Sequence, residues 1–567
     1  MKSQIIEIEK ELDDKISKLS IFNLPFQTVY SILLYTAETI DLKGKSDTAS
    51  DYLSRLSLIY NIVKKNSKKS VLVNTTEALS LLNESYIEDI NFIVAYAHFS
   101  MLMPQIHRDS LTVKSIENNE IKLIFKNQEL ENSELIDKLY SVISIPISFN
   151  SNNKELHSNT LKKAENRDYN INADDFILIE KLYKHHLNYT FNVKTLSDTL
   201  LNSKLGFTNT EYHKFVASFK AFSDYFISLA RNYKNQINTS NSKQDNEKLM
   251  LEYSEFSVCC LTFKTLGWFI AISGLSKQKF DLILSYFLDI YSDNTGENFI
   301  SNSFVGDGYQ VPITLMDTSI IFSPLSIRYL LSFNNILYSI NKNQKTLFDN
   351  HISNELEPTL INQIEYLFSK FTNLELRKNI SYSKSEIDLM ILSKKENLCL
   401  CIQVKTTIAP DSSRTVARVE KRIIEASNQI DIFQKIGQFE QLKLINRTFK
   451  SNISKIKIVN LIIVRSSAGS EKSWNINKQY KIINYILLAK LLCDKLQKKD
   501  FYFINIEAEI LEKQNELIKK SLWSINNETL IVGKYNIEFP NINYDETKII
   551  PTMLNSMECY TELEDTH

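Results

Sequence analysis

Glycine and proline are scarce in this sequence, with only 10 Gly and 9 Pro among 567 residues. These residues form many of the turns in other proteins, so the turns here must depend largely on Asn, Asp and Ser. Hydrophobic residues make up 43% of the chain and charged residues 23%. This composition excludes a fibrous or disordered protein, and the length predicts about three to four folded domains.

Cysteine motifs and long hydrophobic runs are also missing. The six cysteines form no CxxC pair and have no histidines at ligand spacing, which argues against a zinc cluster and against a disulfide framework. The most hydrophobic stretch, residues 259–275, is short and contains Lys264, so it predicts a buried helix. The charged N-terminus has no continuous apolar segment of the kind found in signal peptides. We therefore expect a cytoplasmic protein with no membrane partner.

Neither sign of charge dominates the whole chain, whose net charge is −1. The distribution is uneven, because residues 346–500 contain 25 Lys and Arg against 16 Asp and Glu, whereas residues 501–567 contain 5 against 12. A basic segment in an otherwise acidic chain indicates a module that contacts a polyanion, or a solvated basic face without a ligand. The sequence GxxxxGK[ST] does not occur, so the chain carries no evident ATP-binding loop of that type.

The chain divides into five segments by composition and periodicity. We expect a mostly helical region at 1–234, a polar linker at 235–248, a second helical region at 249–345 with a hairpin near 304–313, an α/β domain at 346–510 and an acidic C-terminal segment at 511–567. Apolar periodicity predicts helices at 25–35 and 87–103, for example, and one strand is expected at 120–125. The fold class is therefore multidomain, with an α-helical N-terminal region and a C-terminal α/β core.

The α/β domain is expected to contain a mixed sheet flanked by helices. Its predicted elements follow the order α-β-β-β-α-β-α-β. They are a helix within 348–371, strands at 374–382, 386–393 and 398–406, a helix at 414–440, a strand at 456–465, a helix at 480–496 and a strand at 501–507.

Polar residues interrupt two of these apolar strands. Strand alternation places Gln403 and Lys405 on the same face as Cys399 and Cys401, and Asp388 lies on the preceding strand. Burying a lysine and an amide beside an aspartate is costly unless these groups pair or bind something. The pattern therefore indicates either a functional site or an ion pair at a sheet edge.

The spacing of these residues resembles the PD-(D/E)XK nuclease superfamily. Its core carries an Asp on the second strand and (D/E/Q)-x-K on the third, and here Asp388 is followed, after fourteen residues, by Gln403-Val-Lys405. The QxK form is similar to Mrr-type restriction endonucleases, and the resemblance covers residues 346–510 only. It implies a restriction-endonuclease-like core that hydrolyses phosphodiester bonds with Mg²⁺ or Mn²⁺. The substrate is expected to be DNA, with RNA not excluded, and association with similar families suggests restriction or anti-phage defence.

The chemistry assigns a role to each residue of the expected site. A phosphodiester needs a divalent cation bound by oxygen ligands, which Asp388 supplies as a carboxylate and Gln403 as a neutral carbonyl oxygen. The superfamily often adds a Glu from the first helix, for which Glu357 is the candidate; Glu365 is the alternative, because Pro358 suggests a later helix start. Lys405 is expected to act on the attacking water or on the charge of the transition state. Replacing it with Ala should abolish cleavage with little loss of stability.

A basic helix face follows the QxK tripeptide. Arg414, Arg418, Lys421 and Arg422 recur at helical spacing and are candidate phosphate contacts, although a solvated face explains them equally well. The helical N-terminal region is a candidate surface for a protein partner or an oligomer. Two alternatives stay open, namely an inactive nuclease fold that binds nucleic acid or acts as a scaffold, and a helical interaction protein in which residues 346–510 are incidental.

Overall fold

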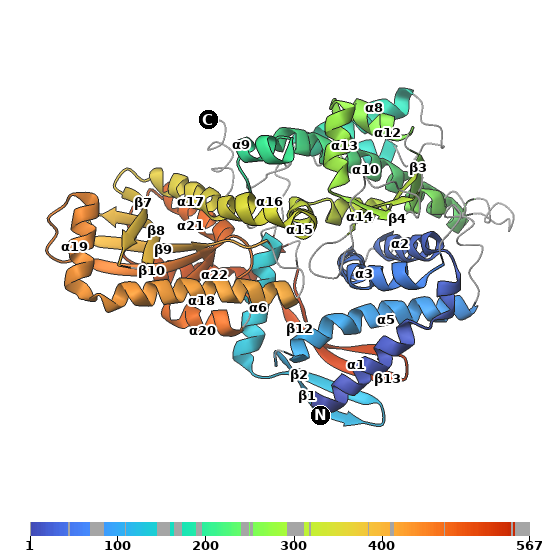
Figure 1. Cartoon of the computed structure of the whole chain (residues 1–567), viewed down its shortest axis with the longest axis horizontal. Helices are drawn as coiled ribbons and strands as arrows, with labels where there is room; N and C mark the ends of the chain where they lie inside the picture. Colours follow the sequence, from blue (N-terminus) through green and yellow to red (C-terminus); the bar gives the residue numbers. More distant parts are fainter. Residues whose placement is uncertain are drawn as a thin grey trace.

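The computed structural model combines helices with three sheets in the part of the chain that it describes (Figure 1). The described residues are 2–42, 46–68, 84–107, 109–143, 159–163, 173–188, 195–239, 249, 253–262, 264–291, 311–316, 319–383, 385–408, 413–469, 471–545 and 548–549. Among the described helices, none combines the length and the apolar character needed to cross a lipid bilayer.

The N-terminal part packs helices against a β-hairpin around one hydrophobic core. The helices predicted around residues 25–35 and 87–103 and the strand predicted at 120–125 are confirmed. The elements are α1 (Lys2–Ile16), α2 (Phe26–Leu42), α3 (Ser46–Asn66), α5 (Glu84–His107), β1 (Leu111–Glu117) and β2 (Glu120–Phe125).

The C-terminal segment completes the N-terminal sheet. Strands β12 (Ser524–Val532) and β13 (Tyr535–Asn543) form a hairpin, and β13 pairs in parallel with β2 to give the order β1-β2-β13-β12. Ile537 and Phe539 of β13 are buried in the N-terminal core. The acidic segment expected at 511–567 therefore folds into α22 and this hairpin. Apolar residues alternate with polar ones along β13, so one face of the strand can pack into the core. Residues 550–567 lie outside the described residues.

The middle part surrounds a small sheet with helices, and its order is β3-β6-β5-β4. An aromatic-rich core joins these elements. They are α8 (Ala173–Asn188), α10 (Asn209–Thr239), β3 (Cys259–Thr262), α12 (Leu266–Ser273), α13 (Lys277–Ser285), β4 (Leu288–Tyr291), β5 (Ile313–Met316), β6 (Ser319–Phe322), α14 (Pro324–Leu330) and α15 (Phe333–Asn343).

Three sequence expectations change in the middle part. Residues 235–239 of the predicted linker belong to α10, and the rest of that linker, 240–248, lies outside the described residues. The run 259–275, predicted as one helix, forms β3 and then α12, since Cys259–Thr262 pairs with β6. Of the hairpin expected near 304–313, residues 304–310 lie outside the described residues.

The C-terminal α/β part contains a five-stranded mixed sheet with the order β11-β10-β9-β8-β7. Strands β7, β8 and β9 are antiparallel neighbours, and β9, β10 and β11 run parallel. The strands predicted at 374–382, 386–393, 398–406 and 456–465 are confirmed. The elements are α17 (Ser353–Ser369), β7 (Glu375–Tyr382), β8 (Ser385–Ser393), β9 (Leu398–Lys405), α18 (Ser413–Lys435), α19 (Gly437–Phe449), β10 (Lys457–Val464), α20 (Glu471–Gln479), β11 (Lys481–Asn484), α21 (Tyr485–Gln497) and α22 (Ile506–Lys520).

The fifth strand is not the one predicted from the sequence. The strand expected at 501–507 is wrong, because this segment leads into α22. The fifth strand is β11, within the run predicted as a helix at 480–496; its Ile482 and Ile483 are fully buried and pair with β10. Asn484 then accepts a hydrogen bond from the Ile486 amide and starts α21. An apolar run of this length holds a short strand and a helix, which periodicity alone does not separate.

The helix predicted at 414–440 is divided into α18 and α19. Gly437 lies at the break with φ +80°, a conformation that glycine adopts readily and that ends a regular helix. Both helices remain on one face of the sheet, against Cys399 and Cys401 of β9.

The core of the α/β part also includes a helix from the N-terminal region. Helix α6 (Gln128–Ile143), drawn in cyan in Figure 1, packs against α20 and α22. Tyr140 is fully buried there, donates a hydrogen bond to the Ile482 carbonyl and accepts one from Gln514. The packed unit therefore extends beyond the predicted range 346–510 and combines segments far apart in the sequence.

Candidate functional site

The site lies where β8 and β9 stop pairing through their backbones. Their register ends at Leu389↔Ile402, one position before Asp388 and Gln403 would face each other. Instead, the Val404 amide donates a hydrogen bond of 2.6 Å to Oδ2 of Asp388. The aspartate side chain thus takes the place of a backbone acceptor, and its carboxylate is fixed between the two strands.

Lys405, the last residue of β9, brings two carboxylates together. Its Nζ lies 3.2 Å from Oε1 of Glu357 and 3.5 Å from Oδ2 of Asp388. Lys405 and Asp388 are each only 6% exposed, whereas the Glu357 side chain is 22% exposed. Three charged groups from α17, β8 and β9 therefore meet at one point, which opens to solvent on the Glu357 side.

Burial determines the electrostatics of the aspartate. Desolvation raises the pKa of Asp388 to about 6, although the Lys405 ammonium and the Val404 amide favour its ionised form. Glu357 acts in the same direction as burial, since two carboxylates close together disfavour full ionisation. A further cation beside Asp388 would stabilise its ionised form.

Glu357, rather than the alternative Glu365, is the glutamate at this point. Helix α17 begins at Ser353, so Glu357 lies within the helix even though Pro358 follows it. Glu365 lies two turns further along and pairs with Lys378 of β7 at 2.6 Å. The concern that Pro358 delays the helix start is therefore removed.

Gln403 is bonded to the backbone of β8 and not to any of the three charged groups. Its Nε2 donates a hydrogen bond of 2.7 Å to the Glu386 carbonyl, and its Oε1 has no hydrogen-bond partner among the described residues. The side chain, 2% exposed, lines a small buried pocket under α18 together with Cys401 and Asn460. We expected the Gln403 amide oxygen to lie beside Asp388 and Glu357 as a metal ligand, and this geometry does not support that placement.

The four basic residues of α18 differ in their surroundings. Arg414 lies in the first turn of the helix, but its side chain is outside the description. Arg418 and Lys421 are exposed, and neither forms an ion pair with another described residue. Arg422 contacts the site itself, with one guanidinium nitrogen 3.3 Å from Glu357 and the other 2.9 Å from Glu425.

Two carboxylates are available to hold a divalent cation here. The described residues contain no group of three or more His, Cys, Asp or Glu side chains arranged around a metal-sized space. Magnesium is commonly held by one or two carboxylates, with water and substrate phosphate oxygens completing its shell. Glu357 and Asp388 fit that limited requirement, because both carboxylates lie within 3.5 Å of the same Lys405 ammonium.

A second carboxylate, which is partly buried, lies at the end of the neighbouring strand β10. Asp137 of α6 accepts hydrogen bonds from the Ser467 hydroxyl and from the amides of Ala468 and Gly469, at 2.7–2.9 Å. Desolvation raises the pKa of Asp137 to about 7. Sequence inspection missed this contact because 330 residues separate Asp137 from Ser467; the polar run after the apolar strand at 456–465 was the available signal.

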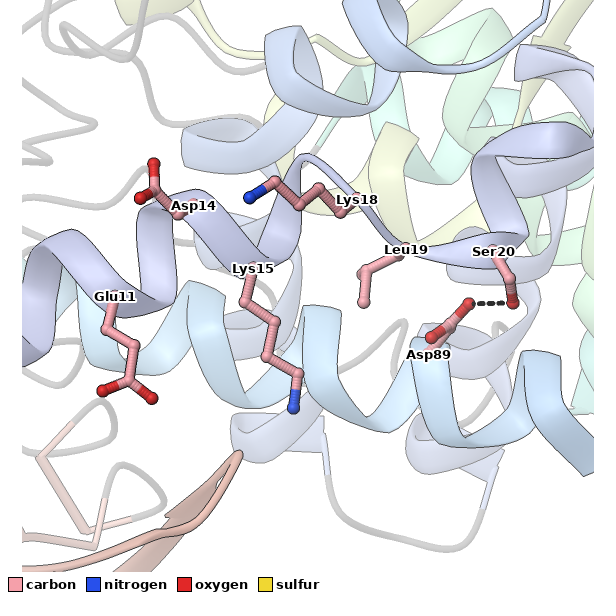
Figure 2. A pocket seen from close by; sticks show the side chains of 7 residues that line it. All are labelled: Glu11, Asp14, Lys15, Lys18, Leu19, Ser20 and Asp89. Atoms are coloured by element: carbon pink, nitrogen blue, oxygen red, sulfur yellow. Dashed lines mark hydrogen bonds between the residues drawn. The ribbon is translucent and has the colours of Figure 1, made fainter.

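Another pocket lies elsewhere, between α1 and α5. It measures about 450 Å³, and Figure 2 shows both acidic and basic side chains along it, with Ser20 bound to Asp89. Its lining residues are Glu11, Asp14, Lys15, Lys18, Leu19, Ser20 and Asp89. Mixed charge without a nucleophile or a ligand cluster gives this pocket no evident chemistry.

Comparison of the chain with protein-family models, with curated proteins and with solved structures gives no match. The functional argument therefore depends on the geometry of Glu357, Asp388 and Lys405.

Proposed function

We propose that this protein is a metal-dependent nuclease that hydrolyses phosphodiester bonds, with DNA as its substrate, and that its α/β part is a restriction-endonuclease-like core. The observation that carries the proposal is the meeting of two carboxylates at the Lys405 ammonium, at 3.2 Å and 3.5 Å. The element order α17-β7-β8-β9-α18 supports it, because the aspartate comes from the second strand and the lysine from the third.

Each group has a role in that reaction. Asp388 and Glu357 would hold a divalent cation, which supplies a water of lowered pKa and neutralises the phosphate oxygens when bound. Lys405 adjoins both carboxylates, and its ammonium would orient the attacking water or stabilise charge on the phosphorus oxygens. Arg418 and Lys421 would contact the phosphate backbone from the exposed side of α18.

Burial favours a chemical role over a purely structural one. A buried ion pair often contributes little net stability, because removing its charges from water offsets the attraction between them. Arg422 adds a second cation at Glu357, but its side chain is 45% exposed and it also pairs with Glu425, so the buried Asp388 has Lys405 as its countercharge. The arrangement is therefore easier to explain if it binds a metal and a phosphate than if it only stabilises the sheet.

A cleavage assay on the full-length chain tests the proposal. We expect cleavage of labelled duplex DNA with Mg²⁺ or Mn²⁺, none with EDTA, and none by Asp388→Asn; single-stranded DNA and RNA give the substrate class. Metal-dependent binding without cleavage of any substrate would contradict the proposal and favour a nucleic-acid-binding scaffold. A role in restriction or anti-phage defence is a further proposal, tested by protection of cells with wild-type protein and not with Asp388→Asn.

A further inference from the structure

The role of Gln403 is set by two contacts between β8 and β9. Beyond Leu389↔Ile402 the strands separate, and two bonds that each involve a side chain replace the missing backbone pairs. One is Val404 N–H to Asp388 Oδ2, and the other is Gln403 Nε2 to the Glu386 carbonyl. The two bonds lie on adjacent residues of β9 and hold β8 on both sides of Ile387.

The orientation of the Gln403 amide is fixed by its partner. A carbonyl oxygen only accepts hydrogen bonds, so the group facing Glu386 must be the NH₂ of the amide. The amide oxygen is then buried without a hydrogen-bond partner among the described residues, in a side chain that lines the same pocket as Cys401 and Asn460. That pocket has no room for a water molecule, and therefore none for a cation with its remaining water ligands.

Resting on the proposed function, we infer that Gln403 is a positioning residue and not a metal ligand. Its bond to Glu386 fixes the separated end of β8, so that the Asp388 carboxylate stays between the Val404 amide and the Lys405 ammonium. Glutamine suits this position because the bond needs a long side chain with a donor. A glutamate side chain has the same length, but its ionised form has no donor and would direct negative charge at a carbonyl oxygen.

The two roles predict opposite effects of one substitution. If Gln403 were a ligand, Gln403→Glu would add a carboxylate to the metal shell and tighten Mn²⁺ binding. If Gln403 is a positioning residue, the same substitution should weaken Mn²⁺ binding. Contacts that orient a metal ligand change metal affinity by about 10–100-fold when they are lost. We expect Gln403→Glu and Gln403→Met each to weaken Mn²⁺ binding by about tenfold, measured by calorimetry on the full-length chain.

Asn460→Leu is the matched control. Asn460 lines the same pocket, but its amide oxygen has no hydrogen-bond partner among the described residues. The variant changes the packing of the pocket and leaves the β8 contact intact, so Mn²⁺ affinity should stay within about twofold of wild type. Tighter binding by Gln403→Glu would overturn the inference, as would an equal loss in Asn460→Leu and Gln403→Met.

Hydrogen exchange provides a readout that does not depend on metal or activity. In the metal-free protein, Gln403→Met should increase exchange at the Val404 amide about tenfold, because the acceptor Asp388 is held less firmly. Unchanged exchange there would contradict the positioning role. Failure of the proposed function looks different, since Asp388→Asn would then leave Mn²⁺ affinity unchanged whatever Gln403 does.

Discussion

Helix α17 makes two glutamate–lysine contacts with the sheet, and they differ in almost every physical respect. Glu357 meets Lys405 at 3.2 Å on the central strand β9, whereas Glu365 meets Lys378 at 2.6 Å on the edge strand β7. The Lys405 side chain is 6% exposed and the Lys378 side chain 34%. The shorter contact is thus the more exposed one, and only Lys405 has a second carboxylate, Asp388, beside it.

This difference separates a candidate site from an ordinary ion pair. An exposed pair contributes about 0–1 kcal/mol, since water and salt screen its attraction. Burying a lysine between two carboxylates has a desolvation cost, and the attraction between the charges offsets that cost only in part. Distance alone would have selected the wrong pair, whereas burial and the number of converging carboxylates select Glu357, Asp388 and Lys405.

The largest expected effect comes from replacing each lysine in turn. Lys405→Ala should lower the rate of DNA cleavage by a hundredfold or more, on the order of the loss of one group that stabilises transition-state charge. Lys378→Ala, which removes only the exposed pair, should cleave within about twofold of wild type. Single-turnover cleavage measures both, and equal rates would remove the distinction between the two pairs.

The same two variants should also differ in stability. The sequence led us to expect little loss in Lys405→Ala, but removing one partner from a buried charge cluster costs about 3–5 kcal/mol. Lys378→Ala should cost less than about 1 kcal/mol. Urea unfolding measures the difference, and cleavage is then compared only under conditions in which both variants stay folded.

Metal affinity distinguishes the two glutamates. Glu357→Gln removes one of two proposed metal-binding carboxylates and should weaken Mn²⁺ binding by about tenfold or more. Glu365→Gln removes a carboxylate of the same helix that faces Lys378 and should leave binding unchanged. A calorimetric titration in which both variants bind like wild type would show that Glu357 is not a ligand.

Asp137 extends the comparison to a carboxylate bound only by neutral donors. Its folded pKa of about 7 lies above the ordinary value of 3.8, so folding favours the protonated form. The free energy of unfolding should therefore fall as pH rises from about 4 to about 7 and then level off, and Asp137→Asn should remove this slope. Because the side chain is partly exposed, we expect the free energy of unfolding of the wild type to fall by only about 1–2 kcal/mol over this range. Asp137→Asn should therefore gain stability relative to the wild type between pH 4 and pH 8. Parallel pH profiles for the two proteins would contradict this.

The smallest expected effect concerns the exposed face of α18. The double variant Arg418→Gln/Lys421→Gln should weaken DNA binding in the same way for every sequence and reduce the dependence of log affinity on log salt by about two units. Arg422 is left in place, since it contacts Glu357. An unchanged dependence on salt would show that Arg418 and Lys421 are solvated surface residues that do not contact DNA.

Much of the α/β part was predictable because its signals are local. Strands β8 and β9 are short, mainly apolar runs separated by a polar turn, and their pairing places Asp388 near Lys405 with no further information. The helix carrying Glu357 was also evident from its apolar spacing. Each of these elements is indicated by a periodic pattern within its own short segment of the chain.

The rest depends on contacts that no local pattern specifies. Strand β11 and helix α21 share one apolar run, so their boundary is set by pairing with β10. The parallel pairing of β13 with β2 and the packing of Tyr140 on β11 join segments hundreds of residues apart. Gln403 was expected at the metal because strand alternation gives the face of a side chain but not the partner that its amide finds where two strands separate.

The position of a bound Mn²⁺ ion tests the central claim most directly. Anomalous diffraction from crystals of the full-length chain grown with Mn²⁺ should place the ion roughly 2.1–2.2 Å from carboxylate oxygens of both Asp388 and Glu357, with Lys405 nearby and Gln403 still bonded to the Glu386 carbonyl. An ion bound elsewhere, or no ion between Asp388 and Glu357 at saturating Mn²⁺, would contradict the account.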